Sequence, residues 1–234
     1  MTAISPHIKR ARWAVIFFFA SNGFLFANWT ARIPEIELFY NINHAQLGSI
    51  LFTLAIGSVL AMPFAGYLNN IWGSRRVTII TGFLFTTMIM GVAIYPSIPL
   101  VYTVFFFMGV GGGAMDVSMN GQAVLVERSW NKSIMSFFHA TFSIGMVIGA
   151  GIGALATRLE IALAHHLFGV AFLGFIALIW ASSHLIDDSK EVISSDDENT
   201  SFTLPTAAIM PIAIIAFCGM TGEGSLNDWS ALFM

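Results

Sequence analysis

The tetrad Asn28-Trp-Thr-Ala31 returns 200 positions later as Asp228-Trp-Ser-Ala231, in both places near the end of a long apolar run. Phe17 and Phe217 keep the same register. Repeats at a fixed period arise when a structural unit is duplicated, although a match of four residues can also arise by chance. The repeat therefore predicts a duplicated helical architecture whose second copy has only begun where the sequence stops.

The composition indicates a membrane protein. Hydrophobic residues make up 56% of the chain and charged residues only 10%, whereas soluble domains carry about 25% charged residues. A net charge of −3 provides no basic field that would attract nucleic acid, so no nucleic-acid partner is expected. The single cysteine, Cys218, cannot form an intrachain disulfide, and no metal-binding spacing is present. The first apolar run is too long for a signal peptide and is interpreted as a retained span.

Seven apolar stretches are long enough to cross a bilayer, which requires about 20 residues of helix. Backbone polar groups find no water partners in lipid, so each stretch is predicted to be helical. The predicted spans are residues 13–32, 46–71, 77–96, 99–126, 133–157, 163–186 and 207–234.

Basic residues in the loops predict the orientation, because cytoplasmic loops are enriched in Lys and Arg. An N-terminus inside the cell places eight of them on the cytoplasmic side: Lys9, Arg10, Arg12, Arg75, Arg76, Arg128, Lys132 and Lys190. Only Arg32 and Arg158 then lie outside. This bias supports both a cytoplasmic N-terminus and the number of spans.

Residues 187–206 form the only extended polar segment and are rich in Asp and Glu. This composition predicts a flexible cytoplasmic linker. We therefore expect a six-helix bundle at residues 1–186, the acidic linker at 187–206, and the first helix of a second bundle at 207–234. A repeat period of about 200 residues implies a full chain of about 400, so the sequence is interpreted as a fragment. A naturally short protein is the alternative.

Asp116 is the clearest functional candidate, because a carboxylate inside a span costs about 2.5–3.5 kcal/mol on insertion scales. Asn120 and the glycines at 109, 112 and 113 share its face at helical spacing. This face predicts a substrate or proton site beside a shallow groove. The alternative is a tight helix crossing, with Asp116 bonded to a neighbouring helix.

Three further candidates lie in the fifth and seventh predicted spans. His139 is expected at the depth of Asn120 and could relay protons, with a plain buried hydrogen bond as the alternative. Glu223 lies near the middle of the last span and is a candidate for proton coupling or for binding hydroxyl groups. Asp228 lies closer to the outer surface and is a weaker candidate.

The first span carries a polar stripe that we expect to face a bundle interior or a water-filled cavity. Asn22 is its deepest member, and Asn28, Trp29 and Arg32 follow toward the outer end. For Trp29 and Arg32 the alternative is anchoring at the membrane interface. Glu35 stands three residues after Arg32 and could pair with it.

Small residues recur every four positions in the second and fifth spans, a pattern that lets helices approach closely. We interpret both sets as packing residues: Gly57, Ala61, Ala65, Gly145, Gly149 and Gly153. Enzymatic and retinal-binding functions find no support. Every lysine lies in a loop or tail rather than in the last span, and no nucleophile–base set or Walker sequence is present. No cofactor is therefore expected.

The loop between the second and third spans resembles the signature of the major facilitator superfamily, Gly-x-Leu-Ala-Asp-Arg-x-Gly followed by basic residues. The matching residues are Gly66, Leu68, Gly73, Arg75 and Arg76. Asn70 and Ile71 stand where the signature has an acidic and a basic residue. The resemblance implies a gating loop formed by Gly66, Asn70, Gly73, Arg75 and Arg76, whose charge network the two departures put in doubt.

Four motifs, at residues 28–35, 115–122, 136–143 and 222–230, resemble the bacterial MosC-like branch of this superfamily. That branch is associated with small polar, sugar-like solutes. The resemblance implies an all-α transmembrane fold of twelve helices in two six-helix halves, of which this chain holds the first half and one helix of the second. Ala150 stands where the antiporter signature has proline, which argues against drug export.

By resemblance, the expected function is proton-coupled transport of a small solute across the bacterial inner membrane by alternating access. The expected partners are the solute, protons, the bilayer, and a missing C-terminal half or a partner chain. The alternatives are an exporter or drug/proton antiporter, a membrane sensor or regulator that does not transport, and an inactive remnant.

Overall fold

The structure, a computed structural model, describes residues 4–189 and 209–233, and omits some side chains of the last helix. The described part is helical and contains no strand. Its helices are α1 (Pro6–Thr30), α2 (Ile33–Tyr40), α3 (His44–Trp72), α4 (Ser74–Gly91), α5 (Ile98–Trp130), α6 (Met135–Arg158), α7 (Leu163–Ser182) and α9 (Met210–Phe233). The predicted all-α class is confirmed.

Each predicted span overlaps one long helix. By length and composition, α3, α5, α6 and α7 can each cross a membrane, and α1 together with α2 adds a fifth span. Helix α4 has 18 residues and carries two arginines directly after its first residue, Ser74, and the apolar part of α9 is also short. Among the described residues, four or five spans therefore meet this test, and seven spans remain a prediction.

The first predicted span does not end cleanly but continues into α2 after a bend of 51°. Helix α1 stops at Thr30, and α2 starts at Ile33 with Pro34 in its first turn. Proline is tolerated there because the first amide groups of a helix have no intrahelical acceptor. The bend carries α2 across the end of the bundle, against α9.

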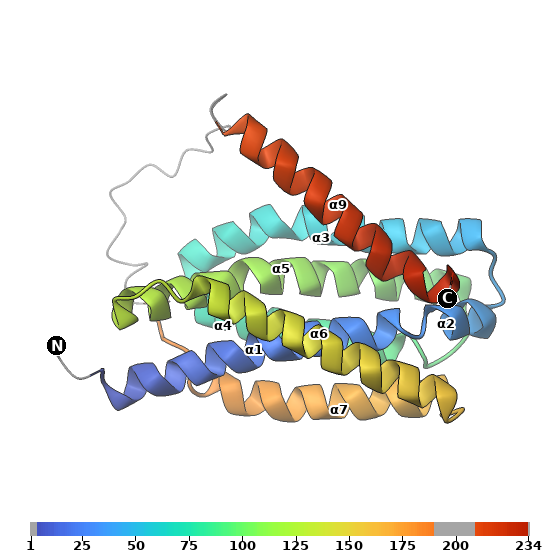
Figure 1. Cartoon of the computed structure of the whole chain (residues 1–234), viewed down its shortest axis with the longest axis horizontal. Helices are drawn as coiled ribbons and strands as arrows, with labels where there is room; N and C mark the ends of the chain where they lie inside the picture. The colour runs from blue at the N-terminus through green and yellow to red at the C-terminus, as the bar shows by residue number, and fades with distance from the viewer. Residues whose placement is uncertain (1–3, 190–208, 234) are drawn as a thin grey trace.

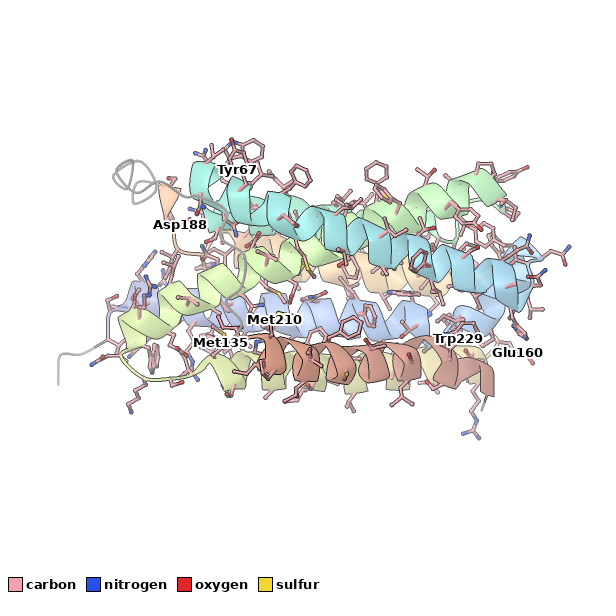
Figure 2. The ribbon with its side chains drawn as sticks, turned by 90° about the horizontal axis from the view of Figure 1, so that it is seen from above. Tyr67, Met135, Glu160, Asp188, Met210 and Trp229 are labelled. Atoms are coloured by element: carbon pink, nitrogen blue, oxygen red, sulfur yellow. The ribbon has the colours of Figure 1, made fainter. Side chains whose placement is uncertain are left out.

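The helices pack in two groups joined along their length (Figure 1). Helix α1 packs on α6 and α7, while α5 packs on α3 and α4. Contacts of α4 with α7 and of α1 with α5 join the groups. Helix α9 lies obliquely across the bundle, with Met210 toward one end and Trp229 toward the other (Figure 2). Near that second end, the Trp229 ring lies beside Gly48 of α3.

Two helix crossings, α1 with α6 and α3 with α5, share one glycine geometry. A Cβ added to Gly23 would collide with the carbonyl of Phe142, and one added to Gly145 with the carbonyl of Ala20. In the other pair, Gly57 faces the carbonyl of Phe106 and Gly109 faces that of Leu54 in the same way. Each glycine thus meets the carbonyl three residues before its partner glycine.

This reciprocal contact lets the two backbones approach without a side chain between them. Gly149 also faces a carbonyl of α1, and Gly153 meets the Ala31 side chain. The predicted packing role of the glycines in the second and fifth spans is confirmed.

Candidate functional site

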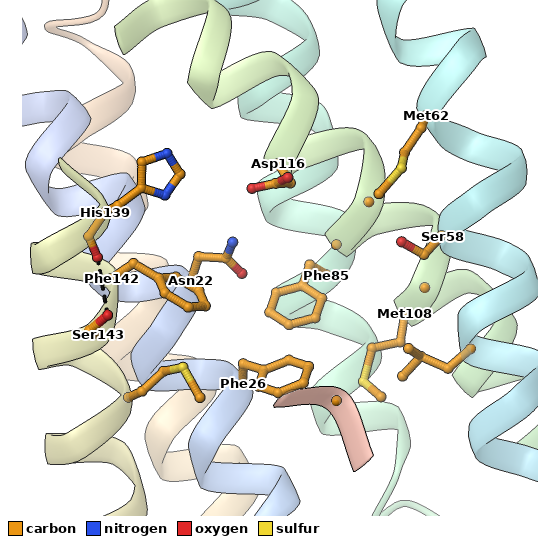
Figure 3. A pocket seen from close by; sticks show the side chains of 16 residues that line it. Asn22, Phe26, Ser58, Met62, Phe85, Met108, Asp116, His139, Phe142 and Ser143 are labelled. Carbon is orange, nitrogen blue, oxygen red and sulfur yellow. Dashed lines mark hydrogen bonds between the residues drawn. The ribbon is translucent and has the colours of Figure 1, made fainter. Parts of the chain in front are cut away.

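A cavity of about 490 Å³ lies between the α1–α6 pair and the α3–α5 pair (Figure 3). Helix α4 contributes Phe85 to its wall, and α9 contributes Gly224. The polar side chains that line it are Asn22, Ser58, Asp116, His139 and Ser143. The remaining wall consists mainly of phenylalanine and methionine side chains. A largely apolar cavity with a few converging polar groups is typical of a small-molecule site.

Asp116 enters the cavity from α5 and is half-buried. Asn120, one turn further along, donates from Nδ2 to the Asp116 carbonyl at 2.9 Å and to its Oδ1 at 3.3 Å. No lysine or arginine is among the described residues that line the cavity. The Asp116 carboxylate therefore has no lysine or arginine partner among the described residues of the cavity wall.

The structure shows a tight crossing on this face, whereas a substrate or proton site there stays a prediction. Gly109 and Gly113 contact α3 at Leu54 and Ser58, as a tight crossing requires. Asp116 is nevertheless bonded within its own helix rather than to a neighbour. The crossing therefore brings α3 and α5 together and leaves the carboxylate in the cavity.

His139 and Asn22 reach the cavity from the side opposite Asp116 (Figure 3). The His139 ring packs edge-on against Phe19, with centroids 5.3 Å apart, and its side chain is exposed. Asn22 is buried, and its Nδ2 lies 3.9 Å from the sulfur of Met119. Four chain segments distant in sequence therefore place an acid, an amide, an imidazole and a hydroxyl around one space.

The outer part of the predicted polar stripe does not line this cavity. Trp29 shares the helix face of Asn22, but its ring packs against the ring of Phe105, with the two ring centroids 5.5 Å apart. Asn28 turns toward α7, where its Oδ1 lies 3.0 Å from His166 Nε2. Both side chains are fully buried, so Trp29 is not an anchor at the membrane interface.

Arg32 belongs to a buried polar cluster at the bend between α1 and α2. Its Nε lies 3.0 Å from Glu35 Oε1, which confirms the predicted pair. Its Nη2 donates to the Ile161 carbonyl at 2.8 Å, and Thr157 donates to Glu35 Oε1 at 2.7 Å. These bonds fasten α2 to the connection between α6 and α7.

Replacing Arg32 with methionine is expected to lower the free energy of unfolding by about 3 kcal/mol, because it leaves Glu35 without its cation in a mostly buried place. Arg32 is only 3% exposed, so solvent cannot compensate. Thermal unfolding of the purified protein in detergent would measure the loss. Arg158→Met, at an exposed arginine in the last turn of α6, is the control. Equal stability of the two variants would contradict the prediction.

The predicted gating loop is a direct junction between two helices. Helix α3 ends at Trp72 and α4 begins at Ser74, with Gly73 between them at φ 81°. That positive φ favours glycine. Arg75 donates from Nη2 to the Ser182 carbonyl at 3.3 Å, and Gly66 has open space beside it. Asn70 is exposed near the end of α3, and Arg76 is exposed in the first turn of α4.

The last helix bears the remaining candidates. The side chains of Glu223 and Asp228 lie outside the described residues, as does the acidic segment beyond Ser189. In the described part of the chain, no cluster of three or more His, Cys, Asp or Glu side chains could hold a metal ion.

Sequence reasoning missed three residues at the helix junction: Ser74, Gln122 and Asp188. Gln122 belongs to a motif whose signal is a family resemblance, and Asp188 belongs to the acidic segment that the composition predicts to be a linker. No sequence signal sets these three residues apart from the residues next to them in the chain; only their proximity in the folded structure does.

An all-helical bundle of apolar helices around a cavity that holds a carboxylate defines an integral membrane protein. The chain belongs to the Major Facilitator Superfamily, whose family model matches residues 13–234.

Three bacterial relatives agree with this assignment. Uncharacterized transporter y4wD of Sinorhizobium fredii is 31% identical over 222 residues, covering 92% of this chain and 57% of the relative. Membrane protein MosC of Rhizobium meliloti is 31% identical, covering 98% of this chain and 55% of that protein. An uncharacterized MFS-type transporter of Yersinia pestis is 30% identical, covering 99% and 59%. The chain thus spans little more than half the length of these relatives.

Proposed function

We propose that the protein is a secondary active transporter that moves a small polar, sugar-like solute across the bacterial inner membrane by alternating access, coupled to protons. The observation that carries this proposal is the cavity between two glycine-packed helix pairs, whose wall includes Asp116, Asn22 and His139. The cavity volume of about 490 Å³ suits a small organic molecule.

The chemistry of the wall supports a hydroxylated solute with an apolar face. Carboxylate and amide oxygens accept hydrogen bonds from hydroxyl groups, and Ser58 and Ser143 can donate or accept them. The rings of Phe26 and Phe85 offer flat apolar surfaces for the carbon skeleton. Protonation of Asp116 would remove its charge, which lowers the cost of moving the occupied site through the bilayer.

The proposed orientation places the N-terminus in the cytoplasm. The first residues of α1, α4 and α6 and the last residues of α3, α5 and α7 lie at one end of the bundle (Figure 1). That end carries most of the basic residues of the described chain, whereas Arg32 and Arg158 lie at the other. We also propose that a second bundle, starting with α9 or supplied by a partner chain, completes the cavity.

Flux into proteoliposomes tests the proposal. Purified protein of native length is reconstituted, an inward proton gradient is imposed, and uptake of labelled hexoses and polyols is measured with and without a protonophore. Accumulation that the protonophore abolishes supports the proposal. Solute accumulation that requires an outward gradient would instead identify an antiporter, and binding without flux would identify a sensor. The absence of both binding and flux would indicate an inactive remnant.

Glu223→Gln is expected to abolish proton-driven accumulation while leaving the protein folded, because glutamine has the shape of glutamate but cannot exchange a proton. Uptake driven by an imposed pH gradient, together with size-exclusion chromatography, would measure both effects. Unchanged uptake in this variant would remove Glu223 from the proton pathway.

A further inference from the structure

Helix α4 begins without a cap of its own. The residue before it is Gly73, which has no side chain to accept the first amide protons. The opening amide groups of any helix lack intrahelical partners, and the partial positive charge there attracts an anion. Asn70, which stands at the acidic position of the loop, contributes no carboxylate.

A carboxylate from a different part of the chain fills this place. Asp188, which follows α7, accepts from the Ser74 amide at 2.7 Å and from the Ser74 hydroxyl at 2.6 Å through Oδ2. Its Oδ1 accepts from the Arg75 amide at 3.3 Å. A Cβ at Gly73 would lie 2.6 Å from Oδ1, so the glycine also leaves room for the carboxylate.

Gln122 of α5 joins the same junction and is fully buried. Its Nε2 donates to the Ser74 hydroxyl at 2.8 Å and to the Ile186 carbonyl at 2.9 Å. Its Oε1 accepts from the Ile186 amide at 2.9 Å. One side chain thus satisfies both backbone groups of Ile186 and fixes the chain just before Asp188.

Asp187, the neighbouring acid, has a different environment. Its side chain is largely exposed, and Oδ2 lies 4.0 Å from Arg75 Nη1, at the limit of an ion pair. Its closer bonds are local, from the amide and hydroxyl of Ser189. The two adjacent aspartates therefore differ: Asp188 accepts from the backbone amides that open α4, whereas Asp187 approaches only the Arg75 side chain.

We propose that Asp188 is a positioning residue for the α3–α4 junction, supplying the carboxylate that the loop lacks at Asn70 and holding that junction to α5 and α7 through Gln122. This role rests on the proposed transport function, in which the junction gates one end of the cavity. Asp188 lies at the same end of the bundle as Tyr67 and Met135 (Figure 2).

Two measurements on the protein of native length test the proposal. In Asp188→Ala, the amides of Ser74 and Arg75 are expected to exchange hydrogen about tenfold faster, as the loss of a charge-assisted hydrogen bond implies. Asp187→Ala is the matched control and should leave both rates unchanged. Asp188→Asn keeps the shape and should give an intermediate rate. Wild-type exchange in α1 and α6 would show that the variants fold.

The second measurement reports gating, which a purely structural role would not alter. A cavity cysteine, Ser143→Cys in a Cys218→Ser background, is labelled with N-ethylmaleimide applied from the Asp188 end. Labelling is expected to become severalfold faster in Asp188→Ala and to stay unchanged in Asp187→Ala. An unaltered labelling rate in Asp188→Ala, or equal effects of both aspartates, would overturn the proposal. Absence of flux in the wild-type protein would refute the proposed transport function but not the role of Asp188, because hydrogen exchange and cysteine labelling do not depend on flux.

Discussion

Asp116→Asn is expected to abolish proton-driven accumulation while preserving exchange of solute between the two sides. Asparagine keeps the shape of aspartate and can still accept the bond from Asn120, but it cannot bind and release a proton. Asp116 is the only carboxylate among the described residues that line the cavity. Removing it should therefore uncouple the solute from the gradient, with accumulation falling to the level set by simple equilibration.

The measurement compares two flux modes in the same proteoliposomes. Accumulation under an imposed proton gradient should be lost, whereas counterflow without a gradient should persist. Asp187→Asn makes the same change in charge at an exposed position outside the cavity and should retain both modes. Gradient-driven accumulation in Asp116→Asn at the wild-type level would exclude this carboxylate from coupling.

Gly145→Leu is expected to prevent folding of the bundle. The Cβ alone would collide with the carbonyl of Ala20, so α1 and α6 would have to separate. Overpacking a well-packed site costs about 1–3 kcal/mol, and here the collision involves a rigid backbone atom instead of a mobile side chain. Separation of these helices would also disrupt the wall of the cavity, which both of them line.

Gly151→Leu provides the matched control on the same helix. Gly151 is exposed, and nothing lies within 4 Å of a Cβ added there. Fluorescence-detected size exclusion after extraction from membranes should show a folded peak for Gly151→Leu and aggregate for Gly145→Leu. Comparable folded peaks would show that the crossing tolerates separation and would refute the packing argument.

Much of the fold could be predicted because the membrane imposes simple rules on the sequence. Apolar stretches of sufficient length must be helical, since lipid offers no partners for backbone groups. The packing role of Gly145 also follows from the sequence, because small residues recurring every four positions lie on one helix face. Asp116 could be singled out because a carboxylate in a span is costly enough to require a purpose.

The helices, the membrane environment, the family and the helix face that carries Asp116 can thus be inferred from the residues without the structure. These properties depend on composition and on the periodicity of one helix at a time. The tertiary structure alone decided which faces meet. It placed Trp29 against Phe105 and not in the cavity, although Trp29 shares the face of Asn22. It also brought Asp188 to the start of α4, across more than a hundred residues, because the capping of a helix end depends on what lies nearby in space and not on what lies nearby in sequence.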